Sequence, residues 1–434
     1  MEQDVIDRLV AGTYPDPDGG EPLRVETRAV VIARSLAGME ADVVRPLSLG
    51  RRLAVVSDPT THAILGERVE RALMSLSEVT SVVLPEQPHA DDATVERLRA
   101  ATVSADALVA VGSGTINDLC KFVSARDRKP YVVFGTAPSM NGYTSLNAAI
   151  TVHGHKKSLP AQAPAGAFLD LSILAAAPVR MIRSGLGDSL CRATAQADWL
   201  LSHLLFDLPY RTMPFVLLAE DEPELFASAE ELVNGDLDAM EKLVRTLLLS
   251  GFGTAICGSS QPASQGEHLI SHYGDMLPDA GRPFTFHGEQ IGVTTLTMAR
   301  LQGCLLDGPP PTVSVDNNTE AHFISRFGPA IGLSCWTDFS RKRLTADKAA
   351  RVNQRIADKW PAIRAAIGAI SLHADMLALV LEQAKAPRTP EDLGWRRASY
   401  QDAVRHAREI RDRYTFLDLA ADAGVLEGLL PQIA

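Results

Sequence analysis

The stretch ALVAVGSGTINDLCKFVSA, residues 107–125, decides the fold class of this chain. An apolar run passes through Gly112 and Gly114 into a segment of helical length. Glycines at a strand-to-helix turn let a phosphate approach the backbone amides, and the helix dipole favours the anion there. The pattern predicts a cradle for the pyrophosphate of a dinucleotide. A plain tight turn stays open as an alternative, because the third glycine of the usual fingerprint is missing.

Short β-branched runs alternate with helix-length segments on both sides of this stretch. Strands are expected in RLAVVSD (52–58), TSVVLP (80–85) and KPYVVFGTAPS (129–139), and a hairpin-like excursion in 147–161. Alternation of this kind is typical of βαβ units and a parallel sheet. We therefore expect residues 1–180 to form an α/β dinucleotide-binding domain with an N-terminal extension.

The pattern changes after about Pro178. Later segments have helical length and spacing, with few strand signals between them. They are 187–205, 227–256, 290–303 and 346–370. Residues 181–434 are therefore predicted to form an all-helical domain that binds metal and substrate, with the site in the cleft between the two domains.

Composition excludes several classes of protein. The chain has 434 residues, 46% of them apolar and 22% charged, and a net charge of −11. An acidic chain without clustered Lys and Arg is not expected to bind nucleic acid or an anionic membrane, although a local basic pocket for a small anion is compatible with it. No apolar run reaches the roughly 18 residues of a membrane span. The five cysteines are scattered and form no C-x-x-C pair, which favours a reducing, cytoplasmic location.

Three segments carry residues suited to metal chemistry. SQGEHLISHYGD (264–275) places His268 and His272 four positions apart, so both imidazoles can share one helix face. Asp188 follows two nearby glycines and precedes an expected helix, and His287 lies in an aromatic and glycine setting before another helix. One carboxylate and two imidazoles leave an open position, as catalytic zinc requires. The alternatives are an amphipathic turn, a helix cap and a structural histidine.

Asp58 ends the first clear strand. A carboxylate there can accept hydrogen bonds from the diol of a ribose. A helix cap made by Asp58 or Thr60 is the alternative.

Six ordered motifs resemble those of the sn-glycerol-1-phosphate dehydrogenase family. They are VGSGTINDLCK, GTAPSMNGYTS, HKKSLPAQAP, AAAPVRMIRSGLGDSLCRATAQADWLL, GSSQPASQGEHLISHYGDM and HGEQIGV. The likeness covers about residues 50–300, and IRDRYTFLDLA near the end is also similar. This family belongs to a superfamily with the iron-containing alcohol dehydrogenases, glycerol dehydrogenase and 3-dehydroquinate synthase. The resemblance implies a dehydroquinate synthase-like fold and an oxidoreductase that uses NAD(H) or NADP(H) and one divalent metal: zinc, nickel or iron.

The resemblance also implies roles for matching positions. Asp188, His268 and His287 match the metal ligands, and His272 matches a histidine that contacts the substrate. Asp58 matches the acid that binds the adenosine ribose. The remaining cofactor positions are Gly112, Ser113, Gly114, Thr115, Ile116, Asp118, Thr136, Ala137 and Ser145.

The implied reaction interconverts dihydroxyacetone phosphate and sn-glycerol 1-phosphate, or a closely related phosphorylated pair. From their charge, we expect Lys156 and Lys157 to meet the substrate phosphate. Asn141 departs from the family pattern, which has a substrate-contacting aspartate there; an amide can bind a hydroxyl but cannot act as a base. Two rivals stay open: a 3-dehydroquinate synthase-like cyclase that uses NAD catalytically, and a catalytically silent relative. A homo-oligomer is compatible with the sequence.

Overall fold

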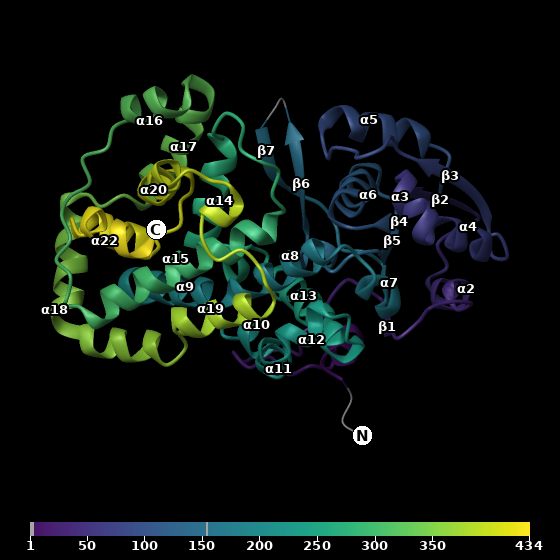
Figure 1. The fold of residues 1–434 in the computed structure, drawn as a ribbon, viewed down its shortest axis with the longest axis horizontal. Helices are drawn as coiled ribbons and strands as arrows, with labels where there is room; N and C mark the ends of the chain where they lie inside the picture. Colours follow the sequence, from purple (N-terminus) through teal and green to yellow (C-terminus); the bar gives the residue numbers. More distant parts are fainter. Residues whose placement is uncertain (1–3, 153–154) are drawn as a thin grey trace. The chain divides into compact units, whose positions relative to one another are not determined.

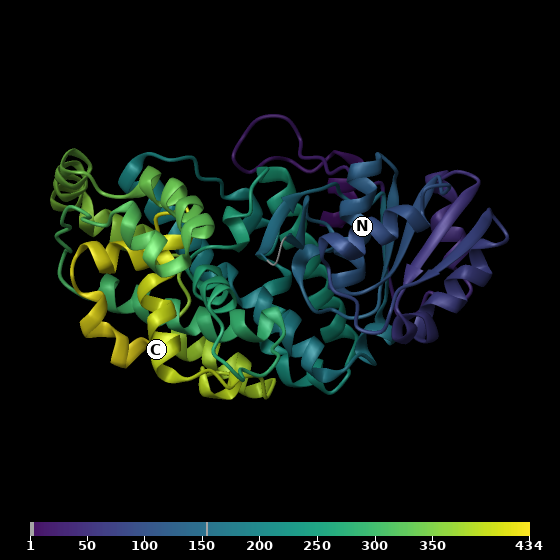
Figure 2. The same ribbon diagram turned by 90° about the horizontal axis from the view of Figure 1, so that it is seen from above.

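The computed structural model describes residues 4–152 and 155–434, without the side chains of His155 and Lys156. Contacts divide the chain into two compact units. The first holds Met1–Ser189 with Thr212–Ser260, and the second holds Leu190–Arg211 with Gln261–Ala434. Figures 1 and 2 show the chain in two views turned by 90°.

The first unit is built on a six-stranded sheet in which all neighbouring strands are parallel. The strand order is β1-β8-β5-β4-β2-β3. The bounds are β1 Ala29–Ala33, β2 Arg52–Ser57, β3 Glu78–Val83, β4 Ala107–Gly112, β5 Tyr131–Gly135 and β8 Gly166–Asp170. The α/β fold with a parallel sheet is therefore confirmed. The sequence pattern did not predict β1, an edge strand in the segment expected to be an N-terminal extension.

Helices cover both faces of this sheet (Figures 1 and 2). The chain moves one way from β2 to β3 and the other way from β3 to β4 and β5, so right-handed crossovers place α4 on one face and α5 and α6 on the other. On the α4 face, Val69 and Leu73 pack with Val109 and Val111 of β4 in one buried cluster. Alternate β4 residues point to the opposite face, which explains why this strand is apolar throughout.

The remaining elements of the first unit are mostly helical. The predicted hairpin is confirmed as a separate antiparallel pair, β6 Asn147–Val152 and β7 His155–Pro160. The helices and single turns are α1 Val5–Ala11, α2 Glu40–Val44, η1 Arg45–Leu47, α3 Pro59–Thr61, η2 His62–Gly66, α4 Glu67–Leu73, α5 Asp92–Ala101, α6 Gly114–Asp127, η3 Asn141–Tyr143, α7 Leu171–Ala175, α8 Val179–Leu190, α10 Met213–Val216, α11 Asp221–Ala227, α12 Ala229–Val233 and α13 Leu237–Cys257.

The two compact units do not coincide with the predicted domains 1–180 and 181–434. Residues 212–260 group with the first unit, although their helical pattern assigned them to the C-terminal domain. Asp18 accepts a hydrogen bond from the Thr212 amide at 2.8 Å, and Arg245 forms an ion pair with Asp4 at 2.8 Å. These contacts attach α10 and α13 to the N-terminal segment, and helical periodicity does not encode such long-range partners.

All regular secondary structure in the described residues of the second unit is helical. Its elements are α9 Arg192–Phe206, η4 Gln261–Ala263, α14 Gly266–Met276, α15 His287–Asp307, α16 Glu320–Phe327, α17 Pro329–Lys342, α18 Ala346–Gly368, α19 Ala374–Gln383, η5 Glu391–Leu393, α20 Arg397–His406, η6 Ala407–Ile410, α21 Phe416–Asp422 and α22 Leu426–Ile433. One large apolar cluster joins most of them, with Phe323, Tyr400 and Phe416 fully buried. In the described part of the chain, no helix is both long and apolar enough to cross a bilayer.

Candidate active site

The carboxyl ends of β5, β4 and β2 lie next to one another, because these strands are parallel neighbours. The strand order reverses between β2 and β4. In open α/β sheets such a switch point leaves a crevice at the carboxyl edge, where cofactors bind. Most of the predicted cofactor residues follow these three strands: Asp58 after β2, Gly112, Ser113, Gly114, Thr115 and Ile116 from the end of β4 into α6, and Thr136 and Ala137 after β5.

The glycine turn after β4 is closely packed at its first glycine. A Cβ on Gly112 would lie 2.6 Å from the Cβ of Ile116, and the Gly112 carbonyl accepts a hydrogen bond from the Thr136 amide at 3.2 Å. Ser113 occupies the N-cap position of α6 without a side-chain cap, and the first turn of this helix contains no acidic residue. The positive end of the α6 dipole is thus suited to a phosphate.

Asp58 makes the helix cap that the sequence analysis weighed against ribose binding. Its Oδ1 accepts a hydrogen bond from the Thr61 amide at 2.8 Å, and the Asp58 amide donates to Thr61 Oγ1 at 3.0 Å. This capping box holds the carboxylate at the carboxyl end of β2. The cap engages one carboxylate oxygen, so ribose binding by Asp58 stays a prediction.

A buried lysine that the sequence analysis missed organises the loop after β5. The Lys121 ammonium on α6 donates to the Gly142 carbonyl, to Ser145 Oγ at 3.1 Å and to the Asn147 carbonyl at 3.0 Å. Burial lowers the pKa of Lys121 to about 8, against the opposing charge of Asp118, 3.8 Å away. The only hint in the sequence is a lysine within the apolar run that follows the glycine turn.

Asp118 and Ser145, both predicted to line the cofactor, take part in this loop and hairpin packing. Asp118 accepts a hydrogen bond from the Ala149 amide of β6 at 3.1 Å. Ser145 Oγ donates to the carbonyls of Gly142 and Asn147, each at 3.2 Å. Their contribution to cofactor binding stays a prediction.

Asn141 contacts a predicted metal ligand through its backbone. Its amide N–H donates to Asp188 Oδ2 at 2.9 Å, while its side-chain Nδ2 donates to Ser250 Oγ at 3.3 Å. The loop lies close to α13 here: a Cβ on Gly251 would lie 2.7 Å from the Asn141 carbonyl oxygen. The backbone amide of Asn141 therefore orients the Asp188 carboxylate. This contact does not depend on what the Asn141 side chain binds.

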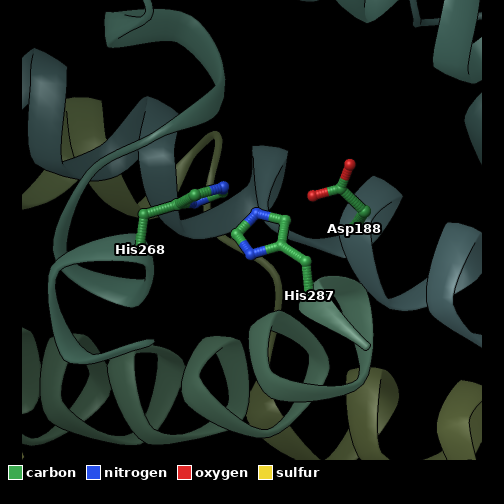
Figure 3. A group of neighbouring side chains, drawn as sticks. All are labelled: Asp188, His268 and His287. Atoms are coloured by element: carbon green, nitrogen blue, oxygen red, sulfur yellow. The ribbon is translucent and has the colours of Figure 1, made fainter. Parts of the chain in front are cut away.

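The three predicted metal ligands come together. Asp188 lies in the last turn of α8, not at a helix start as predicted. His268 lies on α14, and His287 lies at the start of α15. Each of the three offers a ligand atom, and these atoms all lie within 4.8 Å of one another. Figure 3 shows the His287 ring between the His268 ring and the Asp188 carboxylate. Asp188 and His268 are buried, and His287 is half-buried. One carboxylate and two imidazoles suit zinc, nickel or iron(II), so the donor set fits a divalent metal.

His272 lies beside this group, as expected for a residue one helical turn after His268. Its ring centroid is 5.7 Å from that of His268 and 5.9 Å from that of His287, with which it is stacked. Both His268 and His287 belong to the predicted metal group. This position suits a side chain that contacts a substrate bound near the metal.

Glu267, which the sequence analysis did not assign, orients His268. Its Oε1 lies 2.9 Å from His268 Nδ1 and accepts from the Gln265 amide at 2.7 Å, and its Oε2 accepts from Thr194 Oγ1 at 3.2 Å. Burial raises the pKa of Glu267, but the hydrogen bonds from His268 and Gln265 outweigh it and hold the pKa below its usual value. A carboxylate on Nδ1 leaves Nε2 to bind metal, a common arrangement beside metal-binding histidines.

A second group of donor atoms shares His268: Cys191, Glu267 and His268 also lie within 4.8 Å of one another. We favour the first group, because Nδ1 of His268 already faces Glu267 and the Cys191 thiol donates to the Ala263 carbonyl at 3.6 Å. The Cys191 group is therefore better explained as packing behind the metal ligand.

The predicted phosphate-binding pair lies on β7. The side chain of Lys156 is outside the described residues. Lys157 is exposed and stands opposite Ile150 in the hairpin register. Phosphate binding by this pair stays a prediction.

Comparison with known proteins agrees with the class that the fold and donor set define. A family model described as iron-containing alcohol dehydrogenase matches residues 31–178. A solved structure of a probable glycerol dehydrogenase from Sinorhizobium meliloti has a TM-score of 0.60 at 18% identity, and covers 92% of this chain and 96% of that chain. The fold is thus that of the iron-containing alcohol dehydrogenases.

The sequence relatives are more specific. A glycerol-1-phosphate dehydrogenase (NAD(P)+) from Pyrococcus furiosus is 35% identical over 276 residues, which are 64% of this chain and 79% of the relative. A protein of the same name from Bacillus licheniformis is 27% identical over 88% of this chain and 85% of its own length. The chain belongs to the glycerol-1-phosphate dehydrogenase family, as the ordered motifs predicted.

Proposed function

We propose that this protein is a metal-dependent NAD(P)H oxidoreductase that interconverts dihydroxyacetone phosphate and sn-glycerol 1-phosphate. The observation that carries the proposal is the group of Asp188, His268 and His287 within 4.8 Å, in a chain of this family. Bound there, a divalent metal would polarise the ketone carbonyl as a Lewis acid, and the nicotinamide would supply hydride.

The residues of the chain would bind the metal, the cofactor and the substrate, and orient them. Asp188, His268 and His287 hold the metal, with Asn141 and Glu267 fixing the orientation of a ligand each. The start of α6 binds the cofactor pyrophosphate. His272 contacts the substrate, and Lys156 and Lys157 bind its phosphate.

The direct test is reduction of dihydroxyacetone phosphate by protein stripped of metal and reloaded with zinc, nickel or iron(II). We expect NADH oxidation with at least one of these metals, none after stripping, and sn-glycerol 1-phosphate as the product. Stoichiometric NADH consumption would exclude a 3-dehydroquinate synthase-like cyclase, which recycles its cofactor. Metal binding without turnover on any phosphorylated ketone would favour the silent relative.

Asp58 predicts that NADH is used at least as well as NADPH. A carboxylate that accepts from the ribose diol repels a 2′-phosphate. The measurement is kcat/KM for both cofactors in wild type and in Asp58→Asn, which keeps an oxygen for the Thr61 cap but loses the charge. We expect the variant to shift towards NADPH. A strong NADPH preference in wild type would contradict the assignment.

Asn141→Asp is expected to change activity on dihydroxyacetone phosphate only modestly, by about 1 kcal/mol, as for one hydrogen bond. The new carboxylate can accept from Ser250 Oγ, and the amide that orients Asp188 is unchanged. The comparison uses dihydroxyacetone phosphate, dihydroxyacetone and longer keto sugars at saturating NADH. A hundredfold gain on dihydroxyacetone phosphate, about 2.7 kcal/mol, would show that the native substrate is a different ketone.

A cytoplasmic location is part of the proposal. None of the five cysteines, all within the described residues, forms a disulfide, which suits a reducing compartment. Assembly into a homo-oligomer stays a prediction, for which light scattering of the purified protein is the test.

A further inference from the structure

The helix that carries His268 is capped by a residue from another helix. Gln265, at the N-cap position of α14, makes no side-chain cap. Instead, the Gly266 amide donates to Asp198 Oδ2 on α9 at 3.0 Å. A Cβ on Gly266 would lie 2.9 Å from this oxygen and 2.4 Å from Met298 Cε, so a larger residue would displace one of these side chains.

The other oxygen of the same carboxylate binds two further segments. Asp198 Oδ1 accepts from the Phe416 amide at the start of α21 at 2.9 Å, and from Gln302 Nε2 at 3.3 Å. Gln302 lies on α15, the helix that begins with His287. One fully buried carboxylate therefore joins the helices of two predicted metal ligands to the C-terminal segment.

The C-terminal segment makes a second contact with the same turn. The guanidinium of Arg413 donates to the Ser264 carbonyl, two residues before α14. Arg413 therefore contacts the α14 start directly at Ser264, and Phe416 contacts it through Asp198. The motif around residues 410–420 has no ligand in the metal group, and this contact is a physical reason for its presence.

Burial of Asp198 is unfavourable for its charge. Burial raises its pKa to about 8, the charge of Glu267 adds to the rise, and the hydrogen bonds from Phe416, Gly266 and Gln302 oppose it. A helix cap alone does not require a buried acid, since exposed Ser, Thr or Asn residues serve as well. What a buried carboxylate adds is simultaneous acceptance from several separate segments.

We propose that Asp198 is a positioning residue for the metal site, which couples metal binding at His268 to the docking of the Arg413–Phe416 segment. The inference rests on the proposed metal function of His268. Zinc binding would then order the C-terminal segment through Asp198 as well as the α14 start.

The test compares apo wild type with Asp198→Asn and Asp198→Glu, using zinc alone as the probe. An asparagine turns an N–H₂ towards one of the amide donors, and a glutamate keeps the carboxyl group but displaces its oxygens. Asp170→Asn is the matched control, because it changes a buried carboxylate of the first unit, one that pairs with Arg68 and caps α7. Zinc affinity is measured by competition with a chelator, and hydrogen exchange is followed in peptides covering 264–270 and 410–420.

We expect both Asp198 variants to bind zinc at least tenfold more weakly, and Asp170→Asn to keep wild-type affinity even where it lowers Tm. In wild type, zinc should slow exchange in both peptides; in Asp198→Asn it should slow only the α14 peptide. Wild-type zinc affinity in a folded Asp198 variant, or unchanged coupling of the two peptides, overturns the positioning role and leaves the metal site standing. A wild-type protein that binds no zinc, nickel or iron(II) overturns the metal site itself. If Asp198→Asn does not fold, Asp198→Glu decides the question by the same two measurements.

Discussion

Replacing His268 with alanine is expected to abolish stoichiometric metal binding and to lower kcat/KM by about a thousandfold, or about 4 kcal/mol in transition-state terms. His268 is one of only three protein ligands in the predicted group, and it is buried. Removing its imidazole leaves two donors, which is too few to hold a catalytic divalent ion. The measurements are metal content by mass spectrometry and steady-state turnover on dihydroxyacetone phosphate.

Two further variants are measured in the same way, one as a control and one as a test of the alternative donor group. His89→Ala removes an exposed histidine far along the chain from the metal group and should leave metal and rate unchanged. Cys191→Ser tests the alternative donor group and should also keep its metal. Full metal and rate in His268→Ala would disprove the assignment, and loss of metal in Cys191→Ser would favour the alternative group.

The second large effect is expected from Gly185→Ala. A Cβ at Gly185 on α8 would lie 1.7 Å from the carbonyl oxygen of Pro138, a backbone atom in the loop after β5. The clash can be relieved only by moving backbone, either α8, which carries Asp188 one turn later, or the loop that holds Pro138. We expect a loss of about 3 kcal/mol in the free energy of unfolding, together with weaker metal binding.

Gly303→Ala is the matched control for this substitution. Gly303 lies within α15, and a Cβ there meets nothing within 4 Å. Alanine favours the helix over glycine by about 1 kcal/mol, so this variant should be at least as stable as wild type. Thermal unfolding and metal content of both variants separate a steric effect at α8 from a general effect of alanine. A Gly185→Ala protein with unchanged Tm and metal content would show that α8 does not need this close approach.

Local patterns in the sequence predicted strands β2, β3, β4 and β5 of the sheet. The β-branched runs and the glycine turn at 107–125 predicted parallel strands with helices between them, because both signals depend on neighbours within one element. Hydrophobic periodicity does not identify contacts between segments that are far apart in the sequence. It did not show that β1 pairs with β8, nor that α10 and α13 are attached to the N-terminal segment through Asp18 and Arg245.

For the candidate site, the sequence by itself determined residue types: a carboxylate and two imidazoles, in motifs of a known family. Only the tertiary structure decided that Asp188, His268 and His287 converge, since their helices are separated by up to about a hundred residues of chain. It also identified Lys121, Asp198 and Glu267, whose roles depend on what surrounds them. A buried charge is stable only beside suitable partners, and those partners come from other parts of the chain, so its role is defined by the folded packing and not by its own segment.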